Sequence, residues 1–182
     1  MGFDSETAFE SALIKCLVEE KGWKDGVIKY PTEKDLLDNW AKIIFENNRD
    51  IDRLGDFPMT DGEMAQIMGQ IAKLRTPLNL NGFINGGTVQ IIRDNENDTH
   101  NFKKTISLKI FDRNEIAAGR TRYQIAQQPK FKAKNSIYPN RRGDFCLLIN
   151  GMPVIHVELK KSNVPVSEAQ YQIRKYLYEG VF

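Results

Sequence analysis

Apolar residues in the first part of the chain recur at helical spacing. Phe9, Leu13 and Leu17 lie about one turn apart and form one stripe, and Gly22 follows as a stop signal. The same periodicity predicts helices over residues 5–20, 36–47 and 61–75. Residues 79–87 are rich in Asn and Gly, so we expect a loop there.

The second part of the chain contains short apolar runs of the kind found in β-strands. These runs cover residues 88–93, 105–111, 122–132, 145–149 and 154–159. A final helix is predicted from Ser167, because Gln170 stands where a capping box needs it and Glu168 suits the first turn. Helices followed by strands and a helix indicate a mixed α/β, or α+β, domain.

The composition is that of an ordinary globular protein and argues against disulfide-rich, zinc-binding and membrane-spanning classes. A length of 182 residues suits one domain, and 41% hydrophobic with 27% charged residues is ordinary for a globular protein. The two cysteines and two histidines form no sequence cluster, so neither a disulfide framework nor a zinc site is expected. The polar start and the lack of a long uncharged apolar run predict a cytoplasmic, soluble protein with no membrane partner.

Local charge is more informative than the formal net charge of +2. Residues 130–142 contain five basic side chains and no acidic one, namely Lys130, Lys132, Lys134, Arg141 and Arg142. Such a basic strip could face the phosphates of DNA. The alternative interpretation is a solvated basic loop and strand face.

The sequence around Asn150-Gly151 predicts a β-hairpin, because this dipeptide stands between two apolar runs. A two-residue turn would pair Phe145 with His156 and mix apolar and polar side chains on one face. A three-residue loop over residues 149–151 would instead collect most apolar side chains on one face. Burial favours this second register, because a slip of one residue moves every apolar side chain to the wrong face.

In the favoured register one face of the hairpin is polar and can carry chemistry. Phe145, Leu147, Ile155, Val157 and Leu159 share the apolar face, and Asp144, His156, Glu158 and Lys160 share the other. Two adjacent carboxylates repel each other unless a hard cation such as Mg²⁺ binds between them. Bound metal acidifies a water, and a nearby lysine can stabilise an anionic transition state. The pattern predicts metal-dependent phosphodiester hydrolysis; the alternative is an ordinary charged strand end.

This segment resembles the PD-(D/E)xK nuclease superfamily, and most closely its members in the motor and restriction subunits of type I restriction enzymes. There, a strand beginning with Asp, an Asn-Gly turn followed by Pro, and a strand ending Glu-Leu-Lys recur, as they do here. The resemblance implies that Asp144 and Glu158 bind the metal and that Lys160 is the catalytic lysine. Gly143 stands where the superfamily has proline, a departure that leaves the chemical groups intact.

Two further matches lie on predicted helices. Gln172 and Tyr176 match the Gln-x-x-x-Tyr motif of RecB-like members, and their spacing puts them on one helix face. The resemblance implies that Gln172 steadies the site and that Tyr176 lies near DNA. Related nucleases also contribute an acidic residue from the first helix. Glu10 is the candidate, with Glu6 behind it, and both also suit a simple helix surface.

By this resemblance the chain is a Mg²⁺-dependent endonuclease domain that cuts double-stranded DNA alongside modification and specificity subunits. The implied fold is restriction-endonuclease-like, with a central mixed sheet flanked by helices. Residues 1–182 would form one domain from the N-terminal part of a longer subunit, with a helical insertion at 24–87 and the catalytic sheet and following helix at 88–182.

Other domains of such a subunit form an ATP-driven motor. The sequence contains no Gly-x-x-x-x-Gly-Lys-Ser/Thr phosphate loop, so ATP is expected to serve only motor domains outside this chain. The alternative function is a catalytically silent nucleic-acid-binding or assembly module on the same fold.

Overall fold

The computed structural model describes residues 5–74, 76–112, 114, 118–132, 141–161 and 164–179. The chain divides into two compact units. The first unit combines Met1–Leu36 with Arg122–Phe182, and the second unit is Leu37–Thr121. Among the described residues there are five helices and a mixed four-stranded sheet, which confirms the predicted α/β class.

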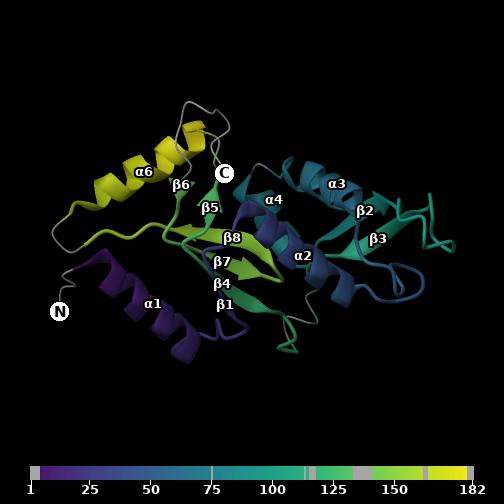
Figure 1. Cartoon of the computed structure of the whole chain (residues 1–182), viewed down its shortest axis with the longest axis horizontal. Helices are drawn as coiled ribbons and strands as arrows, with labels where there is room; N and C mark the ends of the chain where they lie inside the picture. Colours follow the sequence, from purple (N-terminus) through teal and green to yellow (C-terminus); the bar gives the residue numbers. More distant parts are fainter. Residues whose placement is uncertain are drawn as a thin grey trace. The chain divides into compact units, whose positions relative to one another are not determined.

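The first unit is built on that four-stranded sheet. Its strands are β1 (Val27–Lys29), β4 (Tyr123–Gln127), β7 (Phe145–Ile149) and β8 (Met152–Val157), side by side in that order (Figure 1). β1 runs parallel to β4, whereas β4 with β7 and β7 with β8 are antiparallel. The parallel strand β1 was not among the predicted strands.

Apolar side chains cover both faces of this sheet. Helix α1 (Glu6–Glu20), which begins at the N-cap Ser5, packs Ile14 against one face. The cluster there consists of Ile14, Ile125, Phe145, Leu147 and Leu159, with Val157 packed against it. The cluster on the other face consists of Leu36, Ala126, Phe131, Cys146 and Leu148. Successive residues of β7 therefore alternate between two buried layers, as the pleat of a strand requires.

The hairpin of β7 and β8 has a different turn from the one predicted. Ile149 pairs directly with Met152, so the loop is the two-residue turn Asn150-Gly151, and both residues have positive φ (49° and 84°). That combination suits a tight hairpin turn. The Asn150 side chain accepts a 2.9 Å hydrogen bond from the backbone N–H of Arg122 and so ties the turn to the chain entering β4. The prediction of a three-residue loop was wrong.

The extra residue that the burial pattern requires lies in β8 instead. Leu148 pairs with Pro153 and Leu147 with Ile155, so the register shifts by one residue and Val154 forms a β-bulge. Beyond the bulge, Phe145 pairs with Val157. The predicted grouping of apolar side chains is thus confirmed, except that Ile155 is 51% exposed.

The predicted strand over residues 122–132 is two strands. β4 ends at Gln127, and β5 (Lys130–Phe131) pairs separately with β6 (Arg141–Arg142). The break falls at Gln128, whose φ is 52° and whose backbone N–H donates a 2.7 Å hydrogen bond to the carbonyl of Asp144.

The last helix of the first unit begins one residue earlier than predicted. α6 (Val166–Glu179) places Ser167 inside the first turn, so Ser167 does not occupy the predicted N-cap position. The helix itself, and its acidic Glu168 in the first turn, are as expected.

The second unit contains α3 (Asp61–Ile71), α4 (Pro77–Ile84), and a two-stranded antiparallel sheet of β2 (Thr88–Ile92) and β3 (Thr105–Lys109). α2 (Glu33–Asn47) leads into it from the first unit. The predicted boundary at 24–87 therefore differs from the observed one, because β1 belongs to the main sheet while β2 and β3 do not.

Helix α4 lies where a loop was predicted. Thr76 is its N-cap and accepts a 3.2 Å hydrogen bond from the N–H of Asn79, and Pro77 occupies the first helical turn. Both are helix-start signals, which outweigh the weak helix propensity of Asn and Gly over so short a segment.

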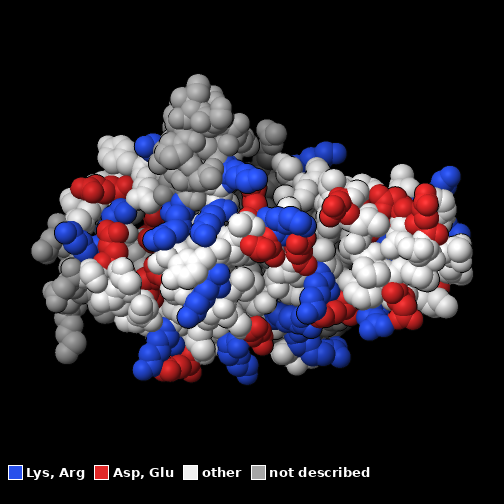
Figure 2. Space-filling model, in the orientation of Figure 1, with Lys and Arg blue, Asp and Glu red and all other residues white. Residues whose placement is uncertain are grey.

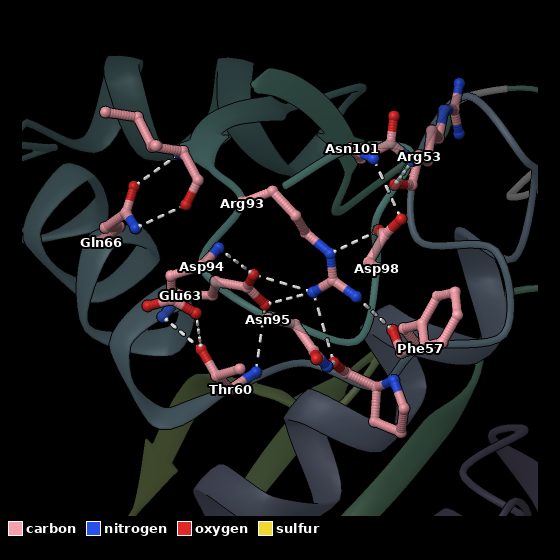
Figure 3. Close-up of polar contacts among 12 residues, drawn as sticks. Arg53, Phe57, Thr60, Glu63, Gln66, Arg93, Asp94, Asn95, Asp98 and Asn101 are labelled. Atoms are coloured by element: carbon pink, nitrogen blue, oxygen red, sulfur yellow. Dashed lines mark hydrogen bonds and ion pairs between the residues drawn. The ribbon is translucent and has the colours of Figure 1, made fainter. Parts of the chain in front are cut away.

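Two glutamines of α3 protect the edge of β2. The Gln66 amide accepts from the N–H of Ile92 at 2.8 Å and donates to its carbonyl at 3.0 Å. Gln70 makes the same pair of contacts with Gln90, at 3.4 Å and 2.6 Å. These side chains imitate the backbone of a further strand, and Figure 3 shows Gln66 facing the strand in this way.

A fully buried arginine, Arg93, directly follows β2. The Arg93 guanidinium is 0% exposed and bonds to Glu63 at 2.6 Å and to Asp98 at 2.9 Å (Figure 3). It also donates to the carbonyl of Phe57 at 2.6 Å. Glu63 in turn completes a capping box with Thr60 at the start of α3. Such a buried charge is tolerated only when its partners satisfy it, so these contacts give the second unit a polar core of its own.

No helix among the described residues is long and apolar enough to cross a membrane.

Candidate active site

Asp144 stands directly before β7 and is fixed through both its backbone and its side chain. Its carbonyl accepts the hydrogen bond from Gln128, and its carboxylate accepts one from the backbone N–H of Leu159. Burial raises the pKa of Asp144, and the negative charges of Glu158 and Glu10 raise it further. The Leu159 hydrogen bond and the charge of Lys160 act in the opposite direction. The surroundings of Asp144 therefore disfavour its charged form on balance.

Glu158 follows β8 and its side chain is completely buried. Its Oε1 accepts a 2.7 Å hydrogen bond from His156 Nε2, and its Oε2 accepts a 2.6 Å hydrogen bond from Gln172 Nε2. Each carboxylate oxygen therefore has a separate donor, which fixes both the position and the plane of the group.

Lys160 and Glu158 are joined through one side chain of α6. Lys160 Nζ donates a 2.7 Å hydrogen bond to Gln172 Oε1, while the amide nitrogen of Gln172 bonds to Glu158. An amide can serve this way because it offers an acceptor and donors on adjacent atoms. Helix α6 thus places Gln172 as a bridge between the two charged groups.

Glu10 brings a third carboxylate to the same end of the sheet. It lies on the buried face of α1, is 4% exposed, and accepts hydrogen bonds from Gln127 at 2.6 Å and from Gln128 at 3.1 Å. Gln127 pairs with Phe145, the neighbour of Asp144, at the start of β7. The interpretation of Glu10 as an exposed helix-surface carboxylate is therefore excluded.

His156 and Cys146 belong to the site although the sequence assigned neither a role. His156 Nδ1 lies 3.3 Å from Cys146 Sγ, and the two residues are paired across β7 and β8. Burial raises the pKa of the Cys146 thiol to about 12, with the charge of Glu158 contributing. The only sequence signal was that His156 shares strand parity with Glu158.

Several predicted residues lie outside the described part of the chain. Lys134 is not described, and neither are the side chains of Arg141 and Tyr176. Lys130, Lys132 and Arg142 are exposed. Basic and acidic side chains are interspersed over the face drawn in Figure 2, in keeping with the small net charge.

Comparison with known proteins shows the family of the chain. Residues 4–180 match the family described as the N terminus of the type I restriction enzyme R protein. The chain belongs to this family.

Relatives of the type I restriction family are similar over the whole chain. An endonuclease subunit of a type I restriction enzyme from Staphylococcus saprophyticus is 28% identical over 189 residues, covering 100% of this chain. A corresponding endonuclease subunit from Staphylococcus aureus strain COL is 28% identical over 187 residues, also covering 100% of the chain. The chain spans 18% of the length of each of these relatives.

The carboxylates of this type I restriction family member have the chemistry of a hard-cation site. Mg²⁺ prefers oxygen ligands and is usually held by one or two carboxylates, with waters and substrate phosphates completing the shell. Asp144 and Glu158 could supply the two carboxylates. The pKa of Asp144 is raised by burial first and then by the negative charges of Glu158 and Glu10, and a bound cation would offset those charges. Within the described residues, no group of three or more His, Cys, Asp or Glu side chains is arranged to hold a metal ion.

A cavity of about 340 Å³ lies within the second unit and contains none of these residues. It is lined by Arg53, Gly86, Thr88, Lys109, Phe111 and Asp112. Its Lys109 already lies 3.5 Å from Asp112. The carboxylates and lysine at the end of the main sheet, rather than this cavity, form the candidate active site.

Proposed function

We propose that this chain is the DNA-cleaving domain of a type I restriction enzyme and that it hydrolyses phosphodiester bonds of double-stranded DNA with Mg²⁺. The observation that carries the proposal is the convergence of Asp144, Glu158 and Lys160, with Gln172 joining the last two. Membership of the family and the similarity to endonuclease subunits of type I restriction enzymes support it. Assignment to the PD-(D/E)xK superfamily is part of the same proposal.

Each side chain has a distinct role in this proposal. Asp144 and Glu158 would hold Mg²⁺, which would supply acidification of a water and neutralisation of charge on the phosphate. Water oxygen forms a bond to phosphorus as the bond to the leaving sugar oxygen breaks. Lys160, held by Gln172 close to Glu158, stabilises the negative charge that develops on the phosphate. Glu10 lies near these two carboxylates and is held in place by hydrogen bonds from Gln127 and Gln128.

The proposed partners are those of a restriction complex. Motor domains of the same subunit would move DNA with ATP, and modification and specificity subunits would select the site. The relatives extend well beyond the region that this chain matches, which leaves room for such domains in them.

Calorimetric titration of the chain with Mg²⁺ tests the metal site. Wild type should bind Mg²⁺, and Asp144→Asn should abolish binding because it removes one of two charged ligands. Glu168→Gln is the matched control, since Glu168 is an exposed carboxylate on α6, and it should bind as wild type does. Wild type that binds double-stranded DNA but no Mg²⁺, with or without that DNA, would instead identify a silent nucleic-acid-binding module.

A further inference from the structure

His156 occupies an unusual position behind the proposed metal ligand Glu158. Its Nε2 contacts Glu158 Oε1 at 2.7 Å, and a carboxylate only accepts hydrogen bonds, so Nε2 carries the donated proton. Its other nitrogen faces Cys146 Sγ at 3.3 Å on the neighbouring strand. The ring is therefore held at both nitrogens, and its side chain is only 15% exposed.

Gly143 leaves the space that the His156 ring occupies. A Cβ atom at residue 143 would lie 2.5 Å from His156 Cε1 and 3.5 Å from each ring nitrogen. A distance of 2.5 Å is far inside van der Waals contact, so any larger residue would displace the ring. Because the ring is held on both sides, displacement would break the contact with Glu158, with Cys146, or with both.

We propose that His156 is a positioning residue that orients Glu158 for metal binding, and that Gly143 is required at its position because it admits the His156 ring. Groups that hydrogen-bond to a ligating carboxylate orient it, and losing them weakens metal binding. Gln172 already orients Oε2, so His156 completes the support by orienting Oε1. This inference rests on the proposed function, because it assigns His156 a role only through Glu158 as a metal ligand.

The proposal also accounts for the departure from the superfamily pattern at residue 143. Proline has a Cβ atom and would meet the ring as alanine does. Glycine at 143 and histidine at 156 are therefore expected to act as a coupled pair.

Binding of Mn²⁺, followed by electron paramagnetic resonance of the free ion, tests this role without relying on catalysis. His156→Leu removes the donor and should weaken Mn²⁺ binding about 10- to 100-fold. His156→Gln can place an amide N–H near the position of Nε2 and should recover most of the affinity. Equal losses in the Leu and Gln variants would overturn the proposal, because they would assign His156 to packing alone.

Gly143→Ala provides a second and independent variant. It should weaken Mn²⁺ binding as His156→Leu does, and the double variant should be no weaker than either single one, because both act through the same contact. Fully additive losses would overturn the coupling. Thermal melting followed by circular dichroism shows whether each variant is folded, and so separates a loss of Mn²⁺ affinity from unfolding.

Failure of this inference can be distinguished from failure of the proposed function. If His156→Leu binds Mn²⁺ as tightly as wild type while Asp144→Asn does not bind, the metal site stands and the role of His156 is overturned. If wild type itself binds no Mn²⁺, the proposed function fails and this inference fails with it.

Discussion

At the scale of single residues, the charged form of Asp144 lies in unfavourable surroundings. Asp144 is placed where burial and two further carboxylates raise its pKa, with one backbone hydrogen bond and Lys160 in partial compensation. Unsatisfied charge of this kind is common where a protein binds a cation or a substrate. The sequence predicted the site residues through their motif. It could not predict the two donors on Glu158, because they come from separate elements and only the fold brings them together.

Removing the Asp144 charge should therefore stabilise the metal-free chain near neutral pH. A carboxyl with a raised folded pKa carries no penalty below its unfolded value of 3.8, and the penalty grows as pH rises through the folded value. Asp144→Asn should thus gain stability over wild type as pH rises from about 4 toward neutral, and the gain should level off once pH passes the folded pKa. Urea unfolding in EDTA across this range measures the gap; a gap that stays constant or narrows would contradict the assignment.

At the scale of elements, the spacing of apolar residues predicted the helix and the faces of the hairpin correctly, but it did not predict the length of the turn. The stripe of Phe9, Leu13 and Leu17 correctly identified α1, and the apolar alternation correctly grouped the side chains of the hairpin. The loop length was wrong, because a bulge at Val154 and a longer loop produce the same alternation. The short parallel strand β1 carried no signal distinguishable from a loop, and its pairing with β4 is a contact over long sequence separation.

The edge of β2 offers a test at the scale of elements. Replacing Gln66 and Gln70 by Met keeps helix propensity but removes the amides that pair with Ile92 and Gln90. The N–H groups of Ile92 and Gln90 should exchange hydrogen about 2- to 10-fold faster, because each loses a bond worth roughly 0.5–1.5 kcal/mol. Met68→Ala, on the same helix at a residue 44% exposed, is the control and should leave both amides protected. Unchanged exchange in the double variant would mean that the amides do not protect the edge.

At the scale of the whole molecule, the chain is two compact units rather than the single domain that its length suggested. The first unit holds the proposed catalytic groups, and the second is organised around Arg93 and its carboxylates. Length and composition could not reveal this division, because the first unit is built from two segments that are far apart in the sequence. The buried Arg93 also carried no sequence signal, since its partners are 30 and 5 residues away along the chain.

The basic strip makes a prediction about DNA binding by the whole chain. If Lys132 and Arg142 contact phosphates, log affinity for duplex DNA should fall against log salt with a slope of about −0.9 per contact. Reversing both charges, in Lys132→Glu and Arg142→Glu, should make the slope shallower by about two such contacts. Charge reversal of Lys73, an exposed lysine of the second unit, is the control. An unchanged slope would mean that these residues form a solvated surface and do not contact DNA.

The central claim, that Asp144, Glu158 and Lys160 form a nuclease site, is tested most directly by DNA nicking rates of two adjacent lysine variants in the restriction complex. Lys160 bonds to Gln172 within the site, whereas Lys161 is an exposed residue beyond the end of β8. Lys160→Ala should lose about 10²-fold or more in rate with DNA affinity little changed, because it stabilises developing charge. Lys161→Ala should nick DNA nearly as fast as wild type. Equal losses in the two variants, or full activity in Lys160→Ala, would contradict the account.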